Sequence, residues 1–237
     1  MEKSFYKSIL QEIQKDRKQL AILIDPDKFD NSQTQAFLKK IPSQTTHLFV
    51  GGSTAKKGDT EMTVAALKEK SNLPVFLFPG DYSQITNRAD VLLFLTLLSG
   101  RNPEYLIGQQ VKSISKLKNS NLEIIPTGYI LIDGGNKSSV SKVTQTQPLT
   151  EENIEHIVNT ALAGQYMGAK MIYLEAGSGA KFPVKPAIIS EVKKALNNSQ
   201  LDGEIPLIVG GGIRNKVQKR DAYYAGADMV VMGTAFE

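Results

Sequence analysis

The sequence predicts an α/β fold, a (β/α)8 TIM barrel with an abbreviated third helix, on three observations. Eight short runs of aliphatic or β-branched residues recur along the chain, and with one exception each leads through a turn into a helix-like stretch. Apolar residues are nearly continuous within these runs, as strands covered on both faces require. Eight such units in 237 residues indicate a closed barrel rather than an open sheet.

The predicted elements follow in chain order. An amphipathic helix precedes the first strand, over 1–18. Between 78 and 90 there is room for little more than a turn, so the third helix is expected to be short or absent. Gly128 and the polar stretch 133–149 predict an extended fifth strand and a long loop before a helix that opens at Thr150. The predicted strands are 20–25, 46–51, 74–78, 90–95, 122–132, 170–175, 206–210 and 228–232.

Nothing in the sequence marks a domain boundary. We therefore expect a single barrel domain over 1–237, with the eighth helix missing because the sequence stops directly after the eighth strand. The longest apolar run, 91–98, is far shorter than the roughly 20 residues that a membrane span needs. Residues 1–19 are charged and lack the apolar centre of a secretory signal. A soluble cytoplasmic protein is the expectation.

The composition narrows the chemistry. The chain has no cysteine and two histidines, His47 and His156, which stand in unrelated contexts. Disulfides, thiolate metal sites and cysteine nucleophiles are thereby excluded, and neither Ser-His-Asp catalysis nor a multi-histidine metal centre is expected. Carboxylates, hydroxyls and backbone amides are left to carry any catalysis. The net charge of +4 favours anionic ligands or membrane surfaces. The sequence has no block of basic residues that would indicate nucleic-acid binding.

Glycine-rich turns follow the last two predicted strands. The seventh strand ends in the glycine triplet 210–212, and the eighth ends in Gly233 and Thr234. Barrel enzymes carry their reactive groups where strands end, and glycines there let backbone N–H groups approach a phosphate. A helix expected to begin at Arg214 adds the positive end of its dipole. These glycines could instead only make tight turns, but two such turns on adjacent closing strands favour a phosphate site.

Carboxylates end the sixth and first predicted strands. Glu175 is a candidate general base for a hydroxyl, with Ser178 as a further phosphate donor, unless it is a capping or ion-paired carboxylate. Asp25 offers the hard oxygen that suits Mg²⁺, although its Asp-Pro-Asp motif is also an ordinary turn sequence. The turn 51–54 after the second strand is expected on the rim opposite the phosphate site. Two anion-binding zones on one rim would suit two phosphate-bearing substrates, one of them metal-bound.

Apolar residues continue past the end of the fourth predicted strand. They run through 91–98 and return at 105–107, and Tyr129 stands on the fifth strand. Core packing accounts for any single one of them, but their concentration beyond the strand end leaves room for an apolar groove. Phe78 and Tyr82 are expected to border it.

These motifs, in this order, resemble the geranylgeranylglyceryl phosphate synthases and their bacterial heptaprenylglyceryl phosphate relatives. The resemblance implies a Mg²⁺-dependent TIM-barrel prenyltransferase that joins a polyprenyl diphosphate, here expected to be geranylgeranyl, to the primary hydroxyl of sn-glycerol 1-phosphate. An enzyme of this kind forms an ether precursor of phospholipids and releases diphosphate. Many members carry a lysine where this chain has Leu23, which places the chain in the second of two main groups. The matching motifs are 24–28, 50–53, 128–129, 173–179, 210–213 and 233–234.

The resemblance also implies roles for individual positions. Asp25 and Ser53 are expected to hold Mg²⁺, and Glu175 is the expected catalytic base. Tyr105 is expected to close the end of the prenyl groove and Tyr129 to form a movable side of it. A homo-oligomer is implied as well, and a lipid product suggests transient membrane contact. The implied glycerol phosphate cradle comprises Tyr173, Leu174, Glu175, Ala176, Gly177, Ser178, Gly179, Gly211, Gly212, Gly233 and Thr234.

Two other interpretations stay open. Barrel isomerases and lyases that act on sugar or indole phosphates grip phosphate in the same way. They usually need a lysine, or paired acid and base residues, facing the barrel centre, and no predicted strand ends in a lysine. The other alternative is a barrel that binds a phosphorylated metabolite without catalysis.

Overall fold

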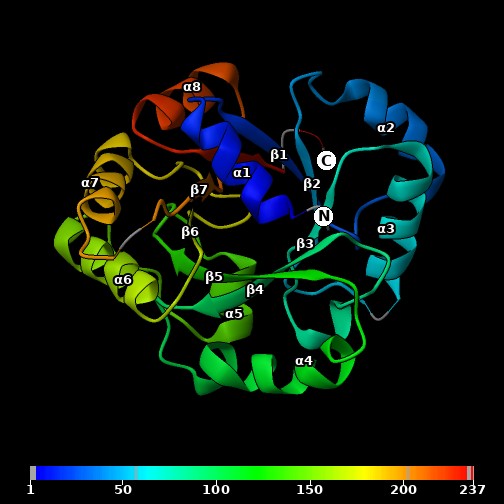
Figure 1. The fold of residues 1–237 in the computed structure, drawn as a ribbon, viewed down its shortest axis with the longest axis horizontal. Coiled ribbons are helices and arrows are strands. Elements are labelled where there is room, and N and C mark those ends of the chain that lie inside the picture. Colours follow the sequence, from blue (N-terminus) through cyan, green and yellow to red (C-terminus); the bar gives the residue numbers. More distant parts are fainter. Residues whose placement is uncertain (1–3, 57, 202, 234–235, 237) are drawn as a thin grey trace.

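The computed structural model describes residues 4–56, 58–201, 203–233 and 236, and it confirms the predicted barrel (Figure 1). The described residues form eight parallel strands that close in chain order, with β8 pairing to β1. All eight lie within one or two residues of their predicted bounds. The strands are β1 (Gln19–Ile24), β2 (His47–Val50), β3 (Val75–Leu77), β4 (Val91–Leu97), β5 (Glu123–Leu131), β6 (Met171–Glu175), β7 (Leu207–Gly210) and β8 (Met229–Met232).

Helices surround the strands. They are α1 (Phe5–Gln14), α2 (Thr34–Lys40), α3 (Asp59–Lys70), α4 (Gln109–Leu117), α5 (Ser139–Thr144), α6 (Ile154–Tyr166), α7 (Pro186–Asn197) and α8 (Lys216–Tyr224), with the 3₁₀ turns η1 (Asn31–Gln33) and η2 (Tyr82–Gln84) and the π-helical turn η3 (Glu104–Gly108). Within the described part of the chain, no helix is both long and apolar enough to cross a bilayer.

Alternate residues of each strand enter two separate apolar clusters, because successive side chains point to opposite faces. Leu20 and Ile22 of β1 pack outward against the helices. Ala21 points inward and joins Phe49 and Phe76 of the neighbouring strands in the barrel interior. Burial on both faces explains why the strands read as continuous apolar runs.

Helix α1 closes the N-terminal end of the barrel (Figure 1). Ile9 on its inner face is buried in the interior cluster. Glu123, the first residue of β5, accepts hydrogen bonds from Ser4 Oγ at 2.7 Å and from the backbone N–H groups of Phe5 and Tyr6. A carboxylate at the positive end of a helix is stabilising. With this end covered, the interior opens at the C-terminal ends of the strands.

The connection from β3 to β4 lacks an α-helix, as predicted. Between Leu77 and Val91 the chain makes only η2, whose cap is Asp81. Helix α4 packs next to η2, where Lys116 Nζ donates to Ser83 O at 2.8 Å. This shortened connection leaves a space between β3, β4 and α4.

The stretch 133–149 is not one long loop, contrary to the prediction. It contains α5, capped by Ser138 Oγ, which accepts from Ser141 N at 3.1 Å. Leu149 then pairs with Ile132 in an isolated parallel bridge. Local side-chain capping and this bridge give the polar segment a defined structure.

Two helices begin later than predicted. Helix α6 begins at Ile154, because Asn153 rather than Thr150 caps it by accepting from His156 N at 3.0 Å. Helix α8 likewise begins after an asparagine cap and not at Arg214. In both cases the asparagine side chain satisfies an N–H group that the helix leaves unpaired.

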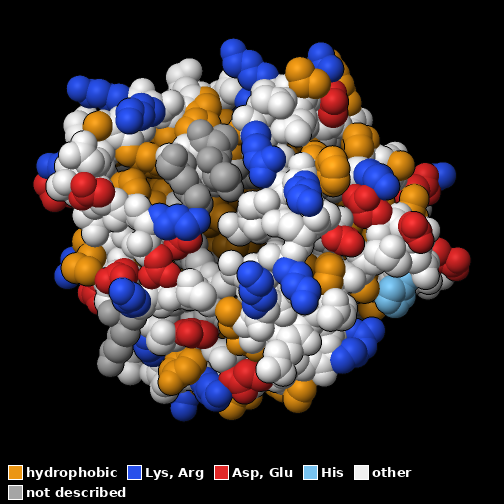
Figure 2. Space-filling view, turned by 180° about the vertical axis from the view of Figure 1, so that it is seen from behind, with side chains coloured by type: hydrophobic (Ala, Val, Ile, Leu, Met, Phe, Trp, Pro, Cys, Tyr) orange, Lys and Arg blue, Asp and Glu red, His pale blue; other side chains and the backbone are white. Residues whose placement is uncertain are grey.

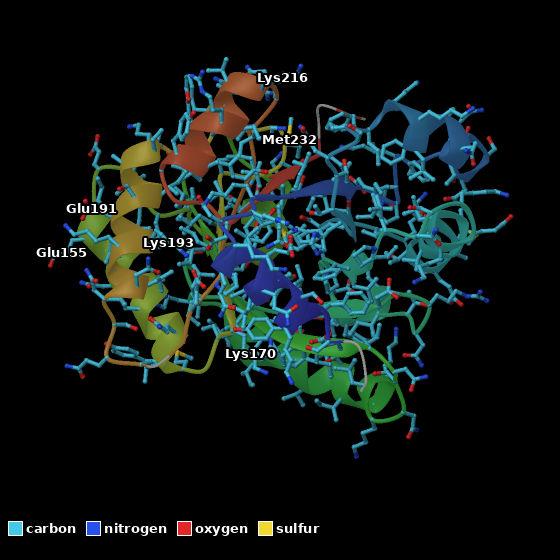
Figure 3. The ribbon with its side chains drawn as sticks, turned by 45° about the horizontal axis from the view of Figure 1, so that its top comes forward. Glu155, Lys170, Glu191, Lys193, Lys216 and Met232 are labelled. Atoms are coloured by element: carbon cyan, nitrogen blue, oxygen red, sulfur yellow. The ribbon has the colours of Figure 1, made fainter. Side chains whose placement is uncertain are left out.

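A buried ion pair ties α7 to the barrel. Figure 3 shows Lys193 on the side of α7 toward the strands and Glu191 on its outer side. Lys193 Nζ lies 2.7 Å from Asp228 Oδ2, and that oxygen also accepts from Leu207 N at 2.8 Å. Removing one partner would leave a buried charge unpaired, so this pair fixes α7 against β7 and β8.

Candidate active site

The open end of the barrel forms a polar mouth, defined here as the cavity between the ends of β1, β2, β6, β7 and β8. It holds about 1010 Å³ of empty space, part of it open to solvent. Figure 2 faces this end and shows a hollow with apolar side chains at its floor and Lys and Arg side chains around it. The predicted site residues that line the mouth are Asp25, Ser53, Tyr129, Tyr173, Glu175, Gly177, Ser178, Gly179, Gly211, Gly212 and Gly233.

Three predicted cradle residues are not among them. The side chains of Leu174 and Ala176 point away from the mouth and pack in the outer apolar cluster. They alternate with Tyr173 and Glu175, which face inward, so strand geometry excludes both side chains. Thr234 lies outside the described residues.

Glu175 ends β6 and points into the mouth although it is only 6% exposed. Its Oε1 accepts a hydrogen bond from Gly177 N at 2.8 Å. The Tyr173 phenol is oriented toward the same carboxyl group but makes no hydrogen bond of ordinary geometry. A Cβ at Gly211 would overlap Glu175 Oε1, and the φ of +77° there is also one that favours glycine. The glycine turn after β7 thus makes room for the carboxyl group.

Burial raises the pKa of Glu175 from 4.5 to about 7. The nearby Tyr173 hydroxyl and the Gly177 N–H oppose this rise, because both stabilise the carboxylate. A carboxyl group that titrates near neutral pH can take a proton from a hydroxyl more readily than an ordinary glutamate. Glu175 is therefore suited to act as a general base.

The same pKa predicts how Glu175→Gln changes stability. The folded protein holds this proton more tightly than the unfolded chain, so the stabilising contribution is complete below pH 4.5 and is lost as the pH rises through about 7. Relative to wild type, the variant should gain about 3 kcal/mol in free energy of unfolding between pH 4 and pH 8. Urea unfolding at both pH values measures this gain. Identical pH dependence in the two proteins would contradict the raised pKa.

The turns after β6 and β7 make a backbone cradle beside Glu175. Gly177 has a φ of +99° and Gly211 one of +77°, and these left-handed glycines turn the backbone around the mouth. The N–H groups of Ala176 and Gly177 donate to Gly210 O and Glu175 Oε1, whereas those of Ser178, Gly179, Gly211 and Gly212 have no acceptor among the described residues. Closely spaced N–H groups of this kind favour anions. Arg214 braces the cradle, since its Nη2 donates to Ala180 O at 2.7 Å. The arrangement can seat a phosphate next to the buried carboxyl group.

Asp25 directly follows β1 and lines the mouth on the wall away from the cradle. Its Oδ1 accepts from Asp27 N at 3.1 Å, and Lys28 Nζ lies 3.6 Å from Oδ2. A Cβ on Gly52 would stand 2.8 Å from Oδ1, so the glycine leaves the carboxylate accessible. Ser53 follows in the same turn and lines the same cavity. The structure thus brings the predicted pair Asp25 and Ser53 together on one wall.

An apolar groove extends from the mouth between β3, β4 and α4. It occupies the space that is left because the β3–β4 connection has no α-helix. It holds about 800 Å³ of empty space, within the size range of ligand pockets. Its lining follows β4 from Leu92 to Leu97, about 16 Å at roughly 3.3 Å per residue. Tyr105, which η3 presents, and Tyr129 both line it, as the sequence predicts. Phe78 and Tyr82 line it too.

The mouth and the groove are continuous. Five residues line both cavities: Gly52, Ser53, Phe78, Tyr129 and Val140. Three aromatic rings meet at this junction, with centroids of Phe78, Tyr129 and Tyr173 5.2 to 5.8 Å apart. The hydroxyls of both tyrosines are buried without a hydrogen-bond partner in the described structure. A polar anion site and an apolar channel therefore meet at an aromatic wall.

Sequence-based prediction missed α5 as a wall of this groove. Val140, Val143 and Thr144 line it, although the segment appears polar overall. The available signals were the Ser138-to-Ser141 capping pattern and the three-residue spacing of the valines.

The PcrB family model matches residues 11–237, nearly the whole chain. The chain belongs to the PcrB family. A relative from Zunongwangia profunda, named geranylgeranylglyceryl phosphate synthase, is 57% identical over 221 residues, which cover 93% of this chain and 92% of the relative. A relative of the same name from Flavobacterium johnsoniae is 50% identical over 235 residues, which cover 99% of this chain and 94% of the relative.

Two solved structures share the fold of this chain over nearly its whole length. The GGGPS of Thermoplasma volcanium has a TM-score of 0.89 and 35% identity to this chain, covering 98% of it and 90% of the other chain. The (S)-3-O-geranylgeranylglyceryl phosphate synthase of Thermoplasma acidophilum has a TM-score of 0.87 and 31% identity to this chain. The match covers 99% of this chain and 92% of the other chain. That structure is a complex with its substrate sn-glycerol-1-phosphate.

Proposed function

We propose that this PcrB-family chain is a prenyltransferase. It joins a polyprenyl diphosphate, geranylgeranyl diphosphate first among them, to the primary hydroxyl of sn-glycerol 1-phosphate. The observation that carries the proposal is the junction between the mouth and the groove, where a buried carboxyl group and an anion cradle face an apolar channel. The names of the relatives and the glycerol phosphate in the Thermoplasma acidophilum complex support the same substrates.

The glycerol phosphate would sit in the cradle, with its phosphate on the N–H groups of Ser178, Gly179, Gly211 and Gly212, which have no other acceptor among the described residues. Ser178 and Gly233 line the same space and complete the proposed seat. Glu175 stands at its inner edge, so a phosphate held there places the distal hydroxyl near the carboxylate.

Glu175 acts as the base in this proposal. The hydroxyl oxygen forms a bond to the allylic carbon of the prenyl chain as the bond from that carbon to diphosphate breaks. The hydroxyl proton passes to the Glu175 carboxylate, and diphosphate leaves with the electron pair of the broken bond. Phe78 and Tyr129 place aromatic faces at the junction, where they can stabilise positive charge that develops on an allylic carbon.

The wall formed by Asp25 and Ser53 fits Mg²⁺. Mg²⁺ binds proteins through one or two carboxylates together with substrate phosphates and water. Among the described residues, no group of three or more His, Asp or Glu side chains could hold a metal ion without further ligands. Asp25 would hold the ion, with Ser53 beside it, because Gly52 leaves the carboxylate open to the mouth. When bound, Mg²⁺ neutralises charge on the departing diphosphate.

The groove would take the prenyl tail. At roughly 0.8 kcal/mol per buried methylene-sized group, a twenty-carbon tail contributes on the order of 10 kcal/mol before ordering costs. A pocket discriminates weakly against a shorter tail and strongly against one that collides with its end wall. Tail length is thus decided where the groove closes.

Tyr105→Ala is expected to lengthen the tail that the protein accepts. Tyr105 lies on η3 and is half-buried against the groove, so removing its ring opens the end of the channel. Product length from an equimolar mixture of prenyl diphosphates, read by mass spectrometry, measures the change. Tyr166→Ala, at an exposed tyrosine on α6, is the matched control. An unchanged product profile in Tyr105→Ala would remove this role.

The proposed activity has a direct test. The protein is incubated with radiolabelled sn-glycerol 1-phosphate, Mg²⁺ and a mixture of prenyl diphosphates, and the products are extracted into organic solvent. Label in the organic phase supports prenyl transfer. Label that stays in water contradicts it and favours a phosphate-binding isomerase, lyase or sensor.

A homo-oligomer, transient membrane contact and a cytoplasmic location stay predictions. Exposed apolar residues on one side of α4 and η3, Ile107, Val111 and Ile114, offer a surface for self-association. Light scattering of the purified protein measures its oligomeric state.

A further inference from the structure

Two loops form the wall between the mouth and the groove. The β2 loop, 51–54, carries Ser53, and the β3 loop, 78–81, carries Phe78. They are in direct contact, since a Cβ at Gly80 would overlap the carbonyl oxygen of Gly52 and come within 2.8 Å of Ser53 Cα. The position of Ser53 therefore depends on how the β3 loop is held.

One buried side chain joins the two loops. Gln84 is 3% exposed at the end of η2, and its Nε2 donates to Gly52 O at 2.8 Å. Its Oε1 accepts from Gly80 N at 3.1 Å. The amide nitrogen of Gln84 is thus bonded to the β2 loop, and its amide oxygen is bonded to the β3 loop. Bonds of this kind fix the orientation of backbone groups that would otherwise be solvated.

The turn that carries Gln84 is itself anchored. Asp81 Oδ1 accepts from Ser83 N at 2.6 Å, which caps η2. Tyr82 N donates to Gln109 Oε1 at 2.8 Å, and Lys116 Nζ donates to Ser83 O at the same distance. Gln84 therefore extends from a turn held by α4 and transmits that fixed position to the β2 loop.

We propose that Gln84 is a positioning residue for the diphosphate end of the prenyl substrate. By fixing Gly52 it holds Ser53 and keeps the approach to Asp25 open, on the side of the mouth away from the glycerol phosphate cradle. Gln84 itself lines neither cavity and acts through the β2 loop. This inference rests on the proposed function and goes beyond it, because it separates recognition of the two substrates.

The test replaces Gln84 with methionine, which has a similar length but no hydrogen-bonding amide. The Michaelis constant for geranylgeranyl diphosphate should rise about tenfold, the effect of losing one good hydrogen bond, and that for glycerol 1-phosphate should stay within twofold. Calorimetric titration of inorganic diphosphate with Mg²⁺, into protein saturated with glycerol 1-phosphate, should show the same tenfold loss. Gln165→Met is the control, because Gln165 is equally buried on α6 and lines neither cavity.

A second variant covers the case in which Gln84→Met does not fold. Gly80→Ala keeps the Gln84 side chain, but the added Cβ would overlap Gly52 O and crowd Ser53 Cα and Gln84 Nε2, so it pushes the two loops apart and should produce the same selective loss. Equal weakening of both substrates, or no weakening, in a folded variant of either kind overturns the proposal. Failure of the proposed function has a different signature, since the wild-type protein itself would then transfer no prenyl group.

Discussion

Replacing Glu175 with glutamine is expected to lower kcat by roughly 10²- to 10⁴-fold, the usual contribution of a positioned general base. The amide keeps the shape of the side chain but cannot take the hydroxyl proton. The Michaelis constant for glycerol 1-phosphate should change little, because the N–H groups of Ser178, Gly179, Gly211 and Gly212 do not donate to Glu175, and the amide oxygen of a glutamine can still accept from Gly177 N. Single-turnover rates with labelled glycerol 1-phosphate measure the loss.

The pH profile gives an independent check on Glu175. Burial raises its pKa to about 7, so wild-type kcat/KM should rise with pH through about 7 and level off above it. The residual activity of Glu175→Gln should lack that step. Glu151→Gln is the matched control, at a half-buried glutamate that pairs with Lys185 outside both cavities. Full activity in Glu175→Gln would dismiss Glu175 as the base.

Asp25→Asn is expected to lower kcat/KM for the prenyl diphosphate by about 10²-fold, with a higher Mg²⁺ concentration needed for half-maximal rate. The change removes the negative charge that Mg²⁺ would meet on the β1 side of the mouth. It leaves the cradle after β6 and β7 intact, so the affinity for glycerol 1-phosphate should stay within twofold. Initial rates over a Mg²⁺ series and calorimetric binding of glycerol 1-phosphate measure both effects.

The control for Asp25→Asn is Asp30→Asn, five residues along the same connection. Asp30 caps η1 by accepting from Ser32 N at 2.9 Å and lines neither the mouth nor the groove. It should behave as wild type at every Mg²⁺ concentration. Equal loss of both substrates in Asp25→Asn would mean that the mouth does not hold two separate anion sites.

Most of the fold could be predicted because burial of the strands requires an apolar pattern that is visible in the sequence. Strands covered on both faces must be apolar throughout, so all eight could be found within a residue or two. The helix starts at Ile154 and Lys216 were placed too early, because asparagine caps compete with nearby turn residues for the same role. Helix α5 was missed, since its six residues are too few to show a clear apolar period.

The candidate site was predictable where residues end strands. Asp25, Glu175 and the glycine triplet 210–212 could be placed on one rim from their positions alone. The side chain of Leu174 packs in the outer apolar cluster, because a continuous run of strand residues places alternate side chains on opposite faces. Gln84 had no such signal, because nothing local marks a glutamine that joins Gly80, four residues away, to Gly52, 32 residues away.

The sequence by itself determined the barrel, the rim on which its polar strand ends gather, and the exclusion of cysteine chemistry, because these follow from local pattern and composition. The tertiary structure alone decided that Glu175 is buried, which raises its pKa, that Gly211 leaves room for its carboxyl group, that α5 forms a wall of the groove, and that the groove opens into the mouth. Those features depend on contacts between segments far apart in the chain, and no single segment carries the information for them.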